Sequence, residues 1–215
     1  MKLIETKNYD ELSRVAADML ISEIKAKPDC VLGLATGSTP IGTYDKLIEA
    51  YKSNEVSFAK VKSINLDEYV GISWSNTESY RYFMNEHLFD HVDIDKTNTH
   101  VPNGLAGDLD EECARYDALY DQIGPVDIQV LGIGLNGHIG FNEPGTSLSA
   151  PTHIVKLSDS TRQANSRNFT SLDAVPYKAI TLGMAGIMKA KKIVLLASGP
   201  AKRDAIEKTV FGEVD

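Results

Sequence analysis

The chain has 215 residues, of which 42% are hydrophobic and 24% charged, and these values are ordinary for a globular protein. A chain of this length can bury a full core without metal ions or disulfide bonds. With 22 Lys and Arg against 30 Asp and Glu, the net charge is −8. This charge argues against general binding of nucleic acids or acidic membranes, because the long-range field repels phosphate groups.

The apolar runs and the cysteines indicate a cytoplasmic protein. The longest apolar runs, such as residues 193–197, are far too short to span a bilayer. The first residues lack the apolar core of a signal peptide. Cys30 and Cys113 lie far apart and form no CxxC motif, so we expect both thiols to stay reduced.

The alternation of short apolar runs with amphipathic stretches predicts the fold class. Strands are predicted, in chain order, at residues 2–5, 30–34, 61–66, 126–132, 153–157, 179–182 and 193–197. Helices are predicted at residues 8–26, with Asn8 as N-cap, and at 40–51, 76–89, 109–123, 159–168, 185–191 and 200–209. The pattern predicts an α/β protein, with residues 1–215 as a single domain and a mostly parallel, Rossmann-like sheet with helices on both faces. Ligands bind such sheets beyond the carboxyl ends of the strands.

The first loop at such a position is Ala-Thr-Gly-Ser-Thr-Pro at 35–40, between a strand and a helix. Gly37 allows a sharp turn, and Pro40 is expected as the first helical residue. The free backbone N–H groups of Ser38 and Thr39, together with the helix dipole, suit a phosphate group. The loop lacks the Lys of a Walker A motif. The alternative is a plain strand-to-helix turn capped by Thr39.

The second loop begins with two adjacent carboxylates, Asp67 and Glu68, directly after the strand at 61–66. Beside a phosphate loop, one of them could serve as a general base. Acidic pairs after strands are more often helix caps or solvated turns.

The third loop, at 132–145, matches GxGxxG after a strand, but glycines and a proline further along prevent the helix that a dinucleotide site needs. The loop presents Asn136, His138 and Glu143 together. A histidine moves protons near neutral pH, and a carboxylate can orient and stabilise it. The alternative is a buried histidine whose ring is hydrogen-bonded to the backbone.

The remaining ionisable residues predict no metal site, because no HExxH motif, His/Cys cluster or EF-hand is present. Arg162, Arg167, Lys202 and Arg203 could complete an anion site. Each is otherwise expected to be a solvated surface charge.

The three loops, in this order, resemble those of the glucosamine-6-phosphate deaminase family. The similarity extends over the whole chain, and its most specific part is Phe-Asn-Glu-Pro at 141–144. The matching segments are residues 34–40, 65–71, 132–145 and 164–167. The resemblance implies conversion of glucosamine 6-phosphate and water to fructose 6-phosphate and ammonia, with no cofactor.

The resemblance also implies residue roles. The sugar phosphate would be held by Gly37, Ser38, Thr39, Arg167 and Lys202. Asp67 would carry a proton from C2 to C1 through an enolamine, and His138, supported by Glu143, would open the pyranose ring. Residues 158–177 would form a mobile lid that brings Arg167 over the ligand.

Two departures from the family pattern carry expectations. Asn136 stands where many relatives have Asp beside the catalytic histidine, and Asn can orient an imidazole but cannot stabilise its charge, so Glu143 must supply that charge. His153 and Val155 replace the basic residues that bind an N-acetylated effector in allosteric relatives. We therefore expect hyperbolic kinetics and favour a monomer over a homo-oligomer. The chain ends short of where the family usually stops, so a last strand is expected to be missing or disordered.

Two rival functions remain open from the sequence. Lactonases that act on 6-phosphogluconolactone have a similar fold and a glycine-rich loop with His, but would lack Phe-Asn-Glu-Pro in this form. A sugar-phosphate-sensing domain would need only the phosphate loop, yet no DNA-binding helix-turn-helix precedes the domain.

Overall fold

The computed structural model describes residues 1–166 and 169–212. The helices are α1 (Tyr9–Ala26), α2 (Ser38–Lys52), α3 (Tyr80–His87), α4 (Leu109–Ile123), α5 (Asp159–Asn165), α6 (Met184–Met188) and α7 (Arg203–Phe211). The strands are β1 (Val31–Leu34), β2 (Lys62–Asn65), β3 (Asp67–Tyr69), β4 (Thr99–His100), β5 (Ile128–Leu131), β6 (His153–Lys156), β7 (Lys178–Thr181) and β8 (Ile193–Leu195). The α/β class predicted from the sequence is confirmed.

A five-stranded parallel sheet forms the centre of the molecule, in the order β4-β2-β1-β5-β8. The register places Leu34 opposite Asn65, so β1 and β2 end at the same edge. A second, antiparallel sheet has the order β3-β7-β6. This second sheet was not predicted, because β3 has only three residues and pairs with a strand far along the chain.

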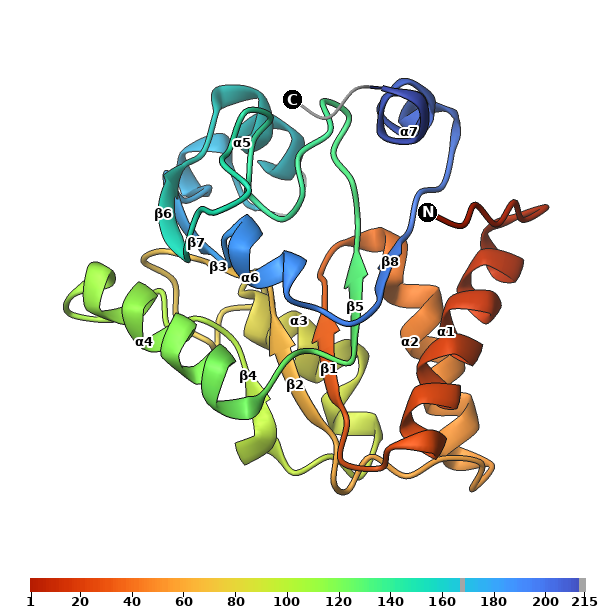
Figure 1. Cartoon of the computed structure of the whole chain (residues 1–215). Helices are drawn as coiled ribbons and strands as arrows, with labels where there is room; N and C mark the ends of the chain where they lie inside the picture. Colours follow the sequence, from red (N-terminus) through yellow and green to blue (C-terminus); the bar gives the residue numbers. More distant parts are fainter. Residues whose placement is uncertain (167–168, 213–215) are drawn as a thin grey trace.

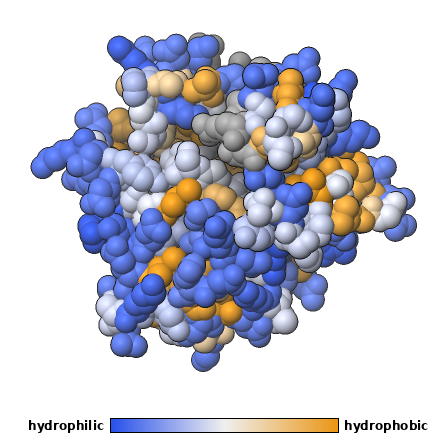
Figure 2. Space-filling view, turned by 180° about the vertical axis from the view of Figure 1, so that it is seen from behind, coloured by the Kyte–Doolittle hydropathy of each residue, from blue (hydrophilic) through white to orange (hydrophobic). Residues whose placement is uncertain are grey.

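Helices cover both faces of the parallel sheet, as predicted (Figure 1). Leu32 and Leu34 of β1 pack with α1 and α2 in one buried cluster. Val31, which precedes Leu32 and so faces the opposite side of the sheet, packs with Tyr116 of α4 and Ile187 of α6 in the other cluster. In Figure 2, which shows the molecule from behind, hydrophilic residues cover most of the visible face.

Some predicted elements are wrong at their bounds or in kind. Residues 2–5 form no strand, and Leu3 and Ile4 are exposed. The helix predicted from residue 40 begins at Ser38, so Pro40 is its third residue. The helix predicted from residue 76 begins only after Ser79, whose side chain caps it. No helix of the described chain is long and apolar enough to cross a membrane.

Candidate active site

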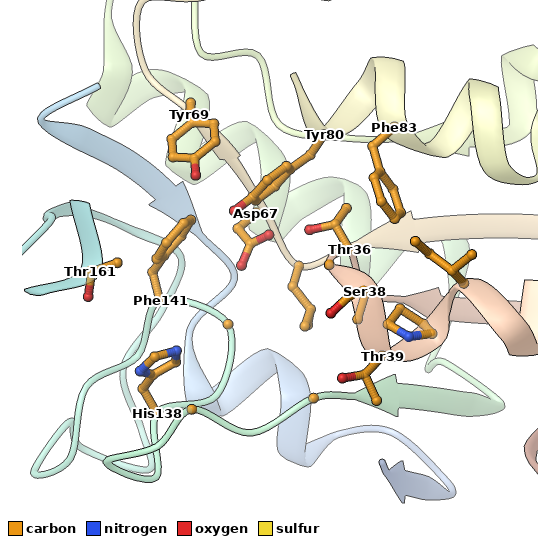
Figure 3. Close-up of a pocket in the computed structure, with 18 of the residues that line it drawn as sticks. Thr36, Ser38, Thr39, Asp67, Tyr69, Tyr80, Phe83, His138, Phe141 and Thr161 are labelled. Atoms are coloured by element: carbon orange, nitrogen blue, oxygen red, sulfur yellow. The ribbon is translucent and has the colours of Figure 1, made fainter. Parts of the chain in front are cut away.

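A cavity of about 650 Å³ lies at the carboxyl ends of β1, β2 and β5, where the sequence predicted ligand binding. It is lined by residues 35–41 after β1, by Asp67 after β2, and by parts of the glycine-rich loop after β5. Figure 3 shows side chains from these loops directed into the cavity, with Ser38 and Thr39 on one side and His138 on another. The three loops singled out in the sequence therefore meet in one cavity.

The first loop presents a helix N-terminus to this cavity. Gly37 has a φ of 96°, which only glycine adopts without strain, and it precedes the first helical residue Ser38. The Tyr9 hydroxyl lies 3.0 Å from the carbonyl oxygens of both Ser38 and Thr39 and accepts the N–H of Gly42. The start of α2 is thus fixed with its first N–H groups unpaired by the helix, which suits an oxyanion. The alternative cap by Thr39 is not observed, because no side chain caps α2.

Lys202 adds a cation to the cavity from a distant part of the chain. It ends a short 3₁₀ helix, Pro200–Lys202, and its Nζ donates to the carbonyl oxygen of Ile133 in the glycine-rich loop at 2.5 Å. Burial lowers the pKa of Lys202, as expected for an ammonium group that has left water and pairs with no carboxylate of the described residues.

Asp67 is the first residue of β3 and is buried, with an exposed fraction of 6%. Burial, and secondarily the charge of Glu68, raises the pKa of Asp67 to about 8. Gly140 faces it closely, since a Cβ there would lie 3.1 Å from Asp67 Oδ2. A carboxyl group held in this way is a much stronger base than an ordinary aspartate.

Glu68 has a different role from its neighbour. Its carboxylate accepts hydrogen bonds from the backbone N–H groups of Tyr69, Tyr80 and Arg81 and from the hydroxyl of Ser79, at 2.8–3.0 Å. It therefore caps α3 and does not line the cavity. Of the two adjacent carboxylates, one faces the cavity and the other fixes a helix.

His138 is joined to Glu143 through Asn136. The His138 Nδ1 lies 2.7 Å from Asn136 Oδ1, and Asn136 Nδ2 donates to Glu143 Oε2 at 2.6 Å. Because the carboxylate only accepts, the Asn136 amide oxygen must face the imidazole and accept from Nδ1–H. This leaves Nε2 as the basic nitrogen. The sequence placed Glu143 in support of the histidine, and the structure adds Asn136 as the link between them.

Three effects act on the pKa of His138. Burial, the largest, lowers it, the charge of Glu143 raises it, and the charge of Lys202 lowers it, with a net shift downward. Gly134 is needed beside the ring, since a Cβ there would lie 2.3 Å from His138 ring atoms. Gly134 of the GxGxxG match thus makes room for the imidazole.

Aromatic side chains form a wall of the cavity that sequence reasoning missed. Tyr69, Tyr80 and Phe141 have ring centroids 4.8–6.1 Å apart, and Phe169 lies edge-on to Tyr69 at 5.6 Å. Tyr69 and Phe141 stand inside the predicted loops, so their position there was an available signal. Tyr80 and Phe169 lie elsewhere in the chain, and only the tertiary fold brings them to the cavity.

The two arginines of the predicted lid have different outcomes. Arg162 is buried away from the cavity, where its Nη2 donates to the carbonyl oxygens of Leu172 and Val175 and its guanidinium lies 3.8 Å from the ring centroid of Tyr177. Arg167 lies outside the described residues. Thr161, on α5, and Phe169 both belong to the predicted lid and line the cavity. Within the described parts of the chain, no three His, Cys, Asp or Glu side chains gather as a metal site.

Comparisons with known proteins agree with the geometry. A family model described as glucosamine-6-phosphate isomerases/6-phosphogluconolactonase matches residues 5–214. Glucosamine-6-phosphate deaminase of Clostridium perfringens strain SM101 is 56% identical over 214 residues, which cover 100% of this chain and 88% of the relative. The glucosamine-6-phosphate deaminase of Geobacillus sp. strain WCH70 is also 56% identical, and the match covers 97% of this chain and 83% of the relative.

Solved structures of both kinds of enzyme in this family description are similar to the chain. The structure of a monomeric glucosamine-6-phosphate deaminase has a TM-score of 0.98 and 49% identity, covering 100% of this chain and 89% of its own. A 6-phosphogluconolactonase from Trypanosoma cruzi has a TM-score of 0.79 at 18% identity, covering 99% and 86%. The second likeness shows a shared fold alone.

Proposed function

The chain belongs to the family of glucosamine-6-phosphate isomerases and 6-phosphogluconolactonases, and we propose that it is a glucosamine-6-phosphate deaminase. It converts glucosamine 6-phosphate and water to fructose 6-phosphate and ammonia. The observation that carries the proposal is that a phosphate loop, a buried carboxyl and an oriented histidine line one cavity in a chain about half identical to named deaminases over its whole length.

The phosphate group binds at the N-terminus of α2. There the N–H groups of Ser38 and Thr39 and the turn at Gly37 face the cavity. The half-buried Lys202 lines the same cavity, and its ammonium group supplies positive charge for binding the phosphate. Closure of residues 158–177 over the ligand, with Arg167 as a further phosphate contact, is part of the same proposal and rests on the family resemblance.

Ring opening is the task of His138. With Nδ1–H bound to Asn136, Nε2 accepts the proton of the anomeric hydroxyl and returns it to the ring oxygen as the C1–O5 bond breaks. The imidazolium formed in between is stabilised by the carboxylate of Glu143, acting through Asn136.

Isomerisation is the task of Asp67. Its carboxylate takes the proton from C2 of the open-chain aldehyde, and the aldehyde oxygen gains a proton from the substrate's own ammonium group, which gives an enolamine. Asp67 then returns its proton to C1. The ketimine that results adds water at C2 and releases ammonia. A buried carboxyl whose pKa is near 8 suits this exchange, because its basicity is close to the pH at which it works.

Two finer points belong to the proposal. A monomer is favoured, since the related deaminase of known structure is described as monomeric. Lactone hydrolysis is the second candidate activity, supported by a shared fold at 18% identity, whereas the deaminases are about 50% identical.

The test is a kinetic comparison on purified protein. Ammonia and fructose 6-phosphate should form in equal amounts from glucosamine 6-phosphate, and 6-phosphogluconolactone should not be hydrolysed. The Asp67→Asn variant should bind the sugar phosphate without turnover. Lactone hydrolysis without ammonia release, or binding without turnover of either compound by the wild type, would overturn the proposal.

A further inference from the structure

A second cavity, of about 340 Å³, opens at the β4 edge of the parallel sheet, between α3 and α4. It shares no lining residue with the first cavity. It also contains none of residues 152–156, where allosteric relatives would hold an effector. The side chains that give it its character are Trp74, Arg81, Lys96, His100, Glu112 and Arg115.

Positive charge predominates in this cavity, although the chain as a whole carries −8. Its lining includes three cations and a single carboxylate, that of Glu112. Glu112 is already bound by Arg115 at 2.6 and 2.7 Å and accepts the N–H of Asn103. Lys96 pairs with Asp90 outside the cavity.

Arg81 forms no ion pair with any carboxylate of the described chain, and the charge of Asp90 has only a minor effect on its pKa. Its guanidinium is held in place, because Nη1 donates to the carbonyl oxygen of Thr99 at 2.9 Å and its central carbon lies 5.5 Å from the ring centroid of Trp74. Burial lowers the pKa of Arg81. A partly desolvated, positioned guanidinium with free N–H groups is suited to bind an anion.

The pKa of His100 reflects the electrostatic field inside the cavity. Its pKa is lowered first by burial and then by the charges of Arg115, Arg81 and Lys62. Three cations from β2, α3 and α4 therefore act on one imidazole. An anion bound among them would offset this field.

We propose that the second cavity binds the phosphate group of a small molecule, with the guanidinium of Arg81 as its principal contact. A phosphate oxyanion matches the fork of N–H donors on a guanidinium, and Lys96 and Arg115 flank it. Val101, Leu119 and the exposed Trp74 provide apolar surface for an organic portion. The shared chemistry is that of a phosphomonoester or of inorganic phosphate.

The test follows the imidazole signal of His100 by NMR, assigned by its loss in a His100→Gln variant, while inorganic phosphate is added. The signal should shift saturably, and NaCl at the same ionic strength should not reproduce the shift. In Arg81→Gln the shift of His100 should be lost, while that of His138 in the first cavity persists. An unresponsive His100, or an equal response to NaCl, would overturn the proposal.

A second pair of variants keeps the test valid if Arg81→Gln fails to fold. Lys96 is half exposed, so Lys96→Gln should fold and bind phosphate about tenfold more weakly at this site, as expected for loss of one charged contact. Lys52→Gln makes the same charge change at the end of α2 and lines neither cavity. Equal affinities in these two variants would overturn the proposal.

Glycerol 3-phosphate then separates the two sources of the anion. Tighter binding than inorganic phosphate, with loss of the difference in Trp74→Ala, identifies a phosphorylated metabolite as the ligand. Equal binding identifies free phosphate. Either result supports the site, whereas no saturable binding of either compound at His100 contradicts it.

Discussion

Replacing Glu143 with Gln tests whether a charge two hydrogen bonds away assists His138. Asn136 connects the two residues through contacts of 2.6 and 2.7 Å. A Gln amide oxygen can accept the same hydrogen bond, so the substitution removes the charge and keeps the geometry. At a separation on the order of 7 Å, a unit charge acts on an imidazolium by about 0.6 kcal/mol in water and about 2 kcal/mol near a protein surface.

The turnover number of Glu143→Gln should therefore fall by about 3- to 30-fold, because the imidazolium formed during ring opening loses this stabilisation. The charge of Glu143 raises the pKa of His138, so its removal lowers that pKa. In the pH profile of kcat/KM, the limb that corresponds to ionisation of His138 should then move to lower pH. Ammonia release measured over a range of pH provides both quantities.

Glu78→Gln is the matched control for this substitution. Glu78 lines the same cavity, and its carboxylate contacts the hydroxyl of Thr77 rather than the histidine loop. The control should change KM at most. Glu143→Gln with the turnover and pH profile of the wild type would refute the coupling through Asn136.

Three further results are expected. Asp67→Asn should abolish turnover and stabilise the fold at alkaline pH. The pKa of Asp67 is about 8 in the folded protein and ~3.9 in the unfolded chain. As the pH rises from the lower to the higher of these values, the free energy of unfolding of the wild type therefore decreases by up to about 1.4 kcal/mol per pH unit. Equal thermal unfolding of the two proteins at pH ~8 would contradict this. Gly134→Ala should reduce turnover at least about tenfold, because its Cβ would lie 2.3 Å from the ring of His138. In the control Gly132→Ala the added Cβ would have no atom within 4 Å, so this variant should remain active. The rate should rise hyperbolically with substrate and should not respond to N-acetylglucosamine 6-phosphate, since His153 and Val155 stand where allosteric relatives are expected to have basic side chains. A sigmoidal curve that this compound relieves would refute that expectation.

The sequence predicted elements whose signals are local. The helix at 109–123 has the bounds expected, and the first helix begins after Asn8, whose side chain accepts the N–H of Glu11. Periodicity and caps lie within the segment itself, so they can be read without the fold. Strand pairing is not local. Residues 2–5 have strand-like composition but pair with no strand of the described residues, whereas β3 is a strand because it pairs with β7.

In the candidate site, too, local features could be predicted from the sequence and tertiary contacts could not. Glycine patterns and chain position were enough to predict that the loops after β1, β2 and β5 would meet, because parallel strands end at one edge of the sheet. Which side chain of the Asp67–Glu68 pair faces the cavity depends on α3, which supplies the donors for Glu68. Tyr80 comes to the cavity on the same helix, and no motif around it indicates this.

The contrast between the two carboxylates explains how the fold prepares a base. Burial raises the pKa of Glu68, and the four hydrogen bonds that it accepts oppose this shift and fix α3 beside β3. Asp67 is buried and is repelled by the charge of Glu68, and both effects raise its pKa. The capping of a helix therefore also sets the basicity of the adjacent residue. A fold that satisfied Asp67 equally well would be more stable and would hold a weaker base, so the loss of stability at high pH and the proposed proton transfer have one physical origin.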